Sequence, residues 1–240
     1  MRRLVPRLES EWRGASASEL SEVEAVAGRP LPRFYHWFLA RLGRDLGPIR
    51  YPTVDFSAAG VLAAYRAGEI ERHPRFLLIG YERDELSPLH YFYDLDRPTR
   101  EDACVVRMLT PRDESHPQFE TFREMLAWGE LWTERVQTAP QRCAGSFRAV
   151  GGRLYAELTE LLEQHGFDTP IETGPYCGLY ERSDATLICS GTPGDPPLQQ
   201  AFHLGGRDAA TLGQLLGAIA GSPTLEVTLS AWTPPLPDAG

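Results

Sequence analysis

The sequence contains no lysine, and all 24 of its basic residues are arginine. This absence excludes mechanisms that need a lysine amine, such as a Schiff base or the lysine of a phosphate-binding P-loop. Cysteine is also scarce. No two of the four cysteines form a C-x-x-C pair and no histidine stands at zinc-finger spacing, so we expect buried thiols and no metal or other cofactor.

Long apolar runs are missing as well. No stretch approaches the roughly 18 consecutive apolar residues that a membrane-spanning helix requires. The N-terminus, MRRLVPRLESEW, has two arginines but no apolar segment behind them, so we expect no secretory signal and a cytoplasmic location. The net charge of −9 argues against direct nucleic-acid binding and suits a basic partner.

Composition changes along the chain. The stretch VQTAPQRCAGS, residues 136–146, is small, polar and contains proline and glycine, as linkers do. The part before it carries most of the arginines, and the part after it is richer in glycine and proline. We therefore predict two domains, residues 1–137 and 145–240.

The first part has the pattern of helices followed by strands. A helix is predicted to start at Ser16 or Ser18 and to end at Gly28, and a second to start at Pro32 and to end at Gly43. Runs rich in β-branched and aromatic residues predict three strands in an antiparallel meander, closed by a helix. The strands span residues 76–82, 89–96 and 103–109, and the closing helix 116–136.

The second part predicts a smaller α+β arrangement. A hairpin is expected to turn at Ser183–Asp184, and Asp208 is expected to cap a helix over 207–221. The remaining predicted elements are a helix over 152–167 and strands over 199–206 and 224–232. The fold class predicted for the whole chain is thus α+β.

A spaced motif runs through the first two predicted helices. It reads E-x3-G-x2-LP-x2-Y-x2-FL and consists of Glu24, Gly28, Leu31-Pro32, Tyr35 and Phe38-Leu39. This resembles the start of the SUKH superfamily, the cell-wall-assembly-regulator-like domains common among bacterial immunity proteins. The segments FLLIGYERDE, YFYDLD, CVVRM and FETFREML follow in the order that the family shows. The resemblance covers roughly residues 15–130.

The resemblance implies an N-terminal domain with an antiparallel sheet and flanking helices. It also implies a protein that is not an enzyme and that binds and neutralises a cognate toxin or secreted effector. The chain departs from the family where RLGRDLG replaces an Asn-Gly-Gly-like turn after the second helix, which affects the surface expected to face a partner. Residues 145–240 resemble no family.

Acidic residues stand at predicted strand ends. Asp94 and Asp96 form a D-x-D in YFYDLD, where alternation would put both carboxylates on one face. Glu82, Asp84 and Glu85 are expected to extend the same acidic rim. The ordinary interpretation is that these carboxylates lie at solvated strand ends. The functional interpretation is that they contact a basic, nuclease-like toxin, whose association an acidic rim would accelerate.

Tryptophans are the other candidate contacts. Trp37 falls beside the apolar stripe of its predicted helix, and Trp128 and Trp132 are four residues apart on one helix face. Packing inside the protein is the ordinary explanation. The functional interpretation is that these tryptophans are exposed and anchor a partner, because tryptophan is enriched in binding hot spots.

Two other functions stay open from the residues alone. A regulatory or scaffolding module could share the predicted fold and bind a host protein. An enzyme could be built on the C-terminal part, with Cys177 or Cys189 as nucleophile and His203 as base. The sequence does not indicate an oligomeric state.

Overall fold

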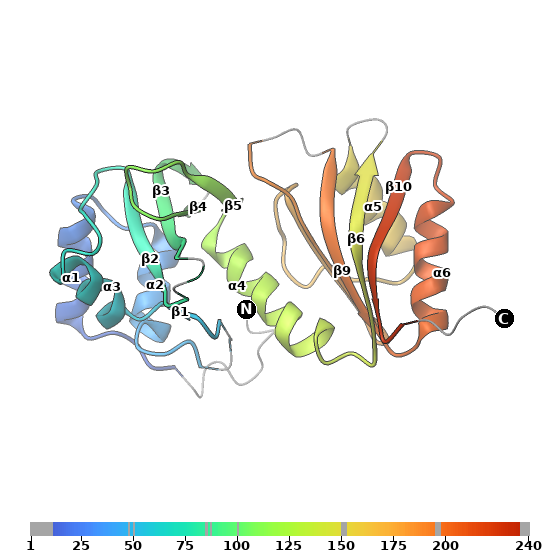
Figure 1. The fold of residues 1–240 in the computed structure, drawn as a ribbon, viewed down its shortest axis with the longest axis horizontal. Helices are drawn as coiled ribbons and strands as arrows, with labels where there is room; N and C mark the ends of the chain where they lie inside the picture. Colours follow the sequence, from blue (N-terminus) through green and yellow to red (C-terminus); the bar gives the residue numbers. More distant parts are fainter. Residues whose placement is uncertain are drawn as a thin grey trace. The chain divides into compact units, whose positions relative to one another are not determined.

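The computed structural model describes residues 12–47, 49, 51–84, 86, 88–99, 101–149, 153–194 and 198–235. Over these residues the protein is α+β, as predicted, with two five-stranded antiparallel sheets and six α-helices (Figure 1). The chain divides into two compact units, Met1–Leu126 and Ala127–Gly240, and the division falls inside helix α4. The prediction of domains at 1–137 and 145–240 stays a prediction. Within the described ranges, no helix is long and apolar enough to cross a membrane.

The sheet of unit 1 (Met1–Leu126) follows chain order, β1-β2-β3-β4-β5, and each neighbouring pair is antiparallel. The predicted three-strand meander is confirmed as β2, β3 and β4, with one short strand added on each side. The elements are α1 (Ala17–Ala27), α2 (Arg33–Leu42), β1 (Val54–Asp55), α3 (Ala58–Arg66), β2 (Phe76–Glu82), β3 (His90–Thr99), β4 (Asp102–Met108), β5 (His116–Phe119) and α4 (Phe122–Leu131).

The ends of α1 and α2 follow the predicted signals. Ser16, one of the two candidates, caps α1 and forms a reciprocal capping box with Glu19. Gly28 ends the helix with φ at 66°, a left-handed conformation that glycine adopts without steric cost. Pro32 directly precedes α2, where its missing N–H leaves no hydrogen bond unmade.

Aromatic rings from several elements make up part of the core of unit 1. Phe122, at the start of α4, lies edge-on to Tyr35, Phe38 and Tyr93 at centroid distances of 6.1, 4.9 and 6.0 Å. A second cluster joins Val61 and Ala64 of α3 to the sheet residues Phe76, Leu78, Phe92, Cys104, Val106 and Met108. Both clusters are buried, so the sheet is tightly held by its helices.

The predicted closing helix over 116–136 begins too early, but its C-terminal end is right, because helical structure continues to Val136. Residues His116–Phe119 form β5, and α4 begins only at Phe122, after Thr121, whose hydroxyl accepts from Glu124 N. Asp102 adds a second cap, because its carboxylate accepts from Arg123 N at 3.1 Å. After Leu131 the helix widens into a π-helix, η2 (Trp132–Val136).

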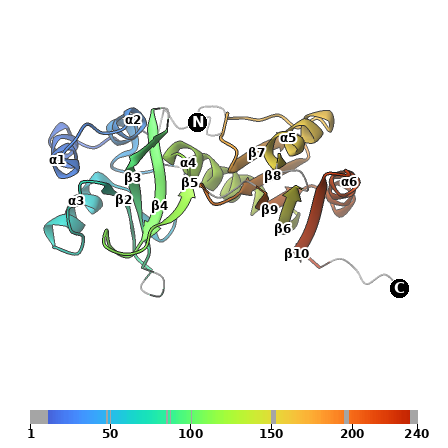
Figure 2. The same cartoon turned by 90° about the horizontal axis from the view of Figure 1, so that it is seen from above.

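The sheet of unit 2 (Ala127–Gly240) has the shuffled order β10-β6-β9-β8-β7. Helices α5 and α6 cover one of its faces, and η2 packs on the other (Figures 1 and 2). The predicted hairpin with its turn at Ser183–Asp184 is confirmed, and so is the cap of Asp208 on α6. The elements are β6 (Gln141–Ala149), α5 (Leu154–Gln164), β7 (Cys177–Arg182), β8 (Ala185–Ser190), β9 (Gln199–Gly206), α6 (Ala209–Ala220) and β10 (Leu225–Thr233).

The predicted linker over 136–146 is wrong, because most of it belongs to the inner strand β6, between β9 and β10. Gly145 of this strand lies where neighbouring residues pack closely, and not in a flexible turn. A Cβ atom at Gly145 would lie 2.0 Å from the carbonyl oxygen of Thr228 and 2.9 Å from the ring of Phe202. Phe147 of the same strand stacks on Phe202 at 4.1 Å.

Candidate functional site

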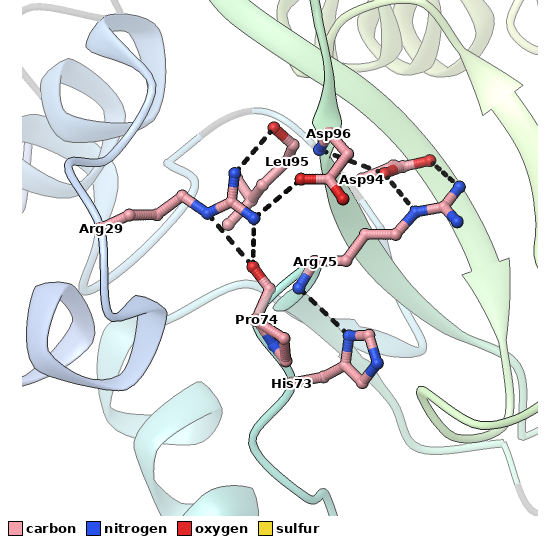
Figure 3. Close-up of polar contacts among 7 residues, drawn as sticks. All are labelled: Arg29, His73, Pro74, Arg75, Asp94, Leu95 and Asp96. Atoms are coloured by element: carbon pink, nitrogen blue, oxygen red, sulfur yellow. Dashed lines mark hydrogen bonds and ion pairs between the residues drawn. The ribbon is translucent and has the colours of Figure 1, made fainter.

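The two aspartates of the D-x-D motif are already paired with arginines of the same unit. Asp94 is buried, with 1% of its side chain exposed, and Arg75 donates to its two oxygens at 2.8 and 2.7 Å (Figure 3). The bidentate geometry is the strong form of this interaction. Asp94 therefore stabilises the junction between β3 and the segment that enters β2.

Asp96 is exposed and pairs with Arg29 at 2.9 Å. Arg29 also donates to the carbonyl oxygens of Pro74 and Leu95, so one guanidinium ties the end of α1 to two other segments (Figure 3). Shallow depressions of 350 and 400 Å³ flank Arg29. The larger depression is lined by the apolar residues Leu31, Leu95 and Ala103. Of its polar lining residues, Arg29 pairs with Asp96, and Arg33 pairs with Glu101.

The prediction of one continuous acidic rim is wrong. The register of β2 and β3 places Phe76 opposite Asp94, whereas Glu82 lies at the other end of β2, next to His90. Glu82 is buried, and its carboxylate accepts from the backbone N–H of the exposed Asp84 at 3.0 Å. Glu85 lies outside the described residues. Because β2 and β3 are antiparallel, the end of β2 at Glu82 lies beside the start of β3 at His90, and Asp94 lies farther along the pair, opposite Phe76.

His90 fixes the Glu82 end of this hairpin. Its Nδ1 accepts from Glu82 N at 3.1 Å, and its ring stacks on Tyr81 at 4.5 Å. Burial lowers the pKa of the imidazole, although the carboxylates of Glu82 and Glu69 oppose that shift. The neutral ring is the form that can accept this hydrogen bond, so His90 has a structural role here.

Trp37 lies in a different environment, on the outer side of α2, where it is half-buried. Its indole stacks on Phe34 at 5.5 Å and meets Trp12 edge-on at 6.2 Å. The guanidinium of Arg41, one helical turn later, lies 5.1 Å from the ring of Trp12 and 5.3 Å from that of Trp37. We call Trp12, Trp37 and Arg41 the tryptophan–arginine clamp.

The clamp is held in place by backbone contacts. Ala15 N donates to Leu39 O and Arg44 N to Arg13 O, both at 2.8 Å, so the segment around Trp12 runs against the end of α2. Gly14 permits this approach, since a Cβ atom there would lie 2.1 Å from Ala40 O. Of the three clamp residues, only Trp37 was predicted from the sequence as a candidate contact. The four-residue spacing of Trp37 and Arg41 on one helix was the signal for the pair.

Trp128 and Trp132 are both half-buried and form another aromatic group, in unit 2. They stack on each other at 5.9 Å, and the ring of His203 from β9 lies 4.4 Å from that of Trp132. The π-helix begins at Trp132. These tryptophans thus cover His203 on one face of the sheet, and burial lowers the pKa of His203.

The sheet places Cys189 and His203, one of the two pairs that an enzyme could use, on opposite faces. Cys189 packs with Leu187 and Phe202 in the core beneath α5 and α6, and burial raises the pKa of its thiol. His203 pairs with Ile188 and points to the opposite face, so Cys189 and His203 cannot act as nucleophile and base. Cys177 shares a face with His203, but Cys177 lies opposite Ser190 and His203 lies opposite Ile188, so the two are separated by strand β8 and by two positions along it. The described residues gather no set of His, Cys, Asp and Glu that could hold a metal ion.

Comparisons with protein-family models, with curated proteins and with solved structures find no match for this chain. The assignment of a function consequently rests on the residues themselves and on their geometry.

Proposed function

We propose that this protein is a non-catalytic immunity protein, which binds a cognate bacterial toxin or secreted effector and neutralises it in the cytoplasm. The supporting observation is the spacing E-x3-G-x2-LP-x2-Y-x2-FL from Glu24 to Leu39, with the family's later segments in order behind it. Helices α1 and α2, the antiparallel meander β2-β3-β4 and helix α4 follow one another along the chain in the order that the resemblance implies.

The motif residues themselves make the framework of unit 1. Tyr35, Phe38 and Leu39 are 0% exposed, and Gly28 supplies the left-handed end of α1. Side chains of this kind set the position of α2 and have no surface to offer a partner. The outer side of the same helix, which carries Trp37 and Arg41, is therefore a better candidate for contact.

Charge is distributed unevenly between the two units. Residues 127–240 contain 13 Asp and Glu against six Arg, whereas residues 1–126 contain 20 against 18. If the toxin is basic, this imbalance favours unit 2 as the part that attracts it over distance. The acidic strand ends of unit 1 contribute less than expected, because Asp94 and Asp96 are already paired with arginines.

The decisive experiment uses the toxin-like gene nearest to the gene of this protein. Cells that express the toxin should grow only when the full chain is present, and the purified proteins should form a stable complex. The matched control is Arg112→Ala, which removes an exposed ion pair with Glu71 and should protect like the native chain. Absence of both protection and binding would contradict immunity and favour a regulatory or scaffolding module.

A further inference from the structure

The tryptophan–arginine clamp contains a cation for which the described part of the chain supplies no charged partner. Arginines elsewhere in unit 1 form ion pairs with carboxylates, as Arg33 does with Glu101 and Arg66 with Glu22. Among the described residues, the Arg41 side chain has no hydrogen-bond acceptor and no ion-pair partner. Its guanidinium lies 5.1 and 5.3 Å from two indole rings that are perpendicular to each other, and no described residue accepts from its five N–H donors.

The surroundings of Arg41 add positive charge. Arg13 and Arg44 are exposed, and their backbones are joined by the hydrogen bond from Arg44 N to Arg13 O. Neither side chain forms an ion pair with the described residues. The clamp and these two arginines form a patch with three positive charges, and Arg44 is close enough to Glu19 for its charge to act on that carboxylate. The net charge of the whole protein is −9.

The patch is rigid, because its aromatic rings continue into the core. Phe34 stacks on Trp37 and meets the buried Phe122 edge-on at 6.2 Å. Trp12 is held from the other side by the segment that Gly14 brings against α2. A preorganised side chain loses little entropy when it binds, and Trp and Arg are the residues most enriched in binding hot spots.

We propose that the tryptophan–arginine clamp binds an acidic segment of a protein partner, with a carboxylate on the Arg41 guanidinium and adjoining carboxylates near Arg13 and Arg44. This names the partner chemistry for unit 1 and rests on the proposed function only in taking that partner to be the toxin. Unpaired arginines attract carboxylates and phosphates alike. The net charge of −9 opposes every polyanion, and it opposes nucleic acid most, because nucleic acid carries a phosphate at each nucleotide. A short protein segment with a few carboxylates is therefore the occupant that we assign.

A peptide probe tests the clamp without the toxin. The native chain is titrated with a short peptide of alternating glutamate and glycine, and separately with the matched glutamine peptide, while the indole N–H signals are followed by NMR. The signals of Trp12 and Trp37, assigned with Trp12→Phe and Trp37→Phe, should move with the glutamate peptide only. Those of Trp128 and Trp132 should stay. The response should weaken with salt, since the Debye length is about 10 Å at 0.1 M ionic strength.

Variants at Arg41 separate charge from stacking. Arg41→Gln should weaken binding of the glutamate peptide about tenfold or more. Arg41→Lys keeps the charge but loses the flat guanidinium, so its affinity for this peptide should lie between those of the native chain and Arg41→Gln. Arg112→Ala is the control that leaves the clamp intact. Thermal unfolding of each variant shows whether the fold is retained. Equal responses to both peptides, or no response at Trp12 and Trp37, would overturn the proposal.

The toxin experiment has separate outcomes for the two proposals. Loss of toxin affinity in Arg41→Gln supports both the clamp and the immunity function. Native protection with unchanged affinity in Arg41→Gln keeps the immunity function and overturns the clamp as the toxin site. A chain that binds the glutamate peptide but not the toxin keeps the clamp and contradicts the immunity function.

Discussion

The two sheets have the same number of strands but are assembled differently. In unit 1 each strand pairs with its neighbour in the chain, whereas in unit 2 the strand β6 pairs with β9 and β10, which lie far along the sequence. The first sheet is therefore specified by local patterns. The sheet of unit 2 depends on β6, whose partner strands β9 and β10 lie far along the sequence. This makes β6 the critical element of unit 2.

The largest expected effect comes from blocking that strand. Gly145→Val places side-chain atoms where the Thr228 carbonyl lies, so β6 and β10 cannot keep their register. We expect a loss of about 3 kcal/mol or more in the free energy of unfolding, measured by urea denaturation. A loss of less than about 1 kcal/mol would show that the sheet tolerates local separation there.

Unit 1 should be sensitive at the ion pair of the buried Asp94 with the partly exposed Arg75. Arg75→Ala leaves the Asp94 carboxylate, with 1% of its side chain exposed, without its bidentate partner. We expect a loss of about 3 kcal/mol in the free energy of unfolding. The control Arg33→Ala, which breaks the exposed pair with Glu101, should cost less than about 1 kcal/mol. Equal losses in the two variants would contradict the assigned role of Asp94.

A pH-dependent effect is expected in unit 2. Burial, with the nearby charge of Glu134, raises the pKa of Glu130 from 4.5 to about 7. The folded state therefore holds the Glu130 proton more tightly than the unfolded state does. Ionisation of Glu130 destabilises the fold, and this loss of stability grows as pH rises from 4.5 and is complete above 7.

Glu130→Gln should therefore raise the free energy of unfolding by about 2 kcal/mol at pH 8 and leave it nearly unchanged at pH 4.5. Urea denaturation at the two pH values measures the difference. The exposed Glu160, on α5 of the same unit, provides the control variant Glu160→Gln, which should show no such dependence. A pH-independent effect of Glu130→Gln would contradict the raised pKa.

The smallest effects concern helix glycines, which differ between the units. A Cβ atom at Gly213 in α6 meets nothing within 4 Å, whereas one at Gly60 in α3 would lie 2.5 Å from Asp55 Oδ2. Gly213→Ala should stabilise the protein by about 0.5–1 kcal/mol, because alanine has the higher helix propensity. Gly60→Ala should not stabilise it. Paired thermal melts measure both, and stabilisation by Gly60→Ala would show that Asp55 moves aside easily.

Most elements followed from local signals, and the failures share one cause. The cap at Ser16, the turn at Ser183–Asp184 and the cap at Asp208 depend on neighbouring residues and were predicted correctly. Residues 141–146 were taken for a linker because glycine and small polar residues favour turns when no partner strand is considered. The T-x-x-E signal at Thr121, which marks the true start of α4, was present and missed.

The candidate site was less predictable than the fold. Trp37 was identified, but its pairing with Trp12 across the chain depends on the close approach that Gly14 permits. The acidic residues were identified by type, and their separation along the strand pair required the register of β2 and β3. Whether a charged residue is free to bind a partner depends on which arginine the fold places beside it.

The sequence by itself determined the α+β class, the ends of α1 and α2 and the meander of unit 1, because capping, proline placement and side-chain alternation act over a few residues. Only the tertiary structure decided that β6 is an inner strand, that Cys189 and His203 face apart, and that Arg41 lies beside the rings of both Trp12 and Trp37. Each of these depends on contacts between residues distant in the chain, which local propensity does not encode.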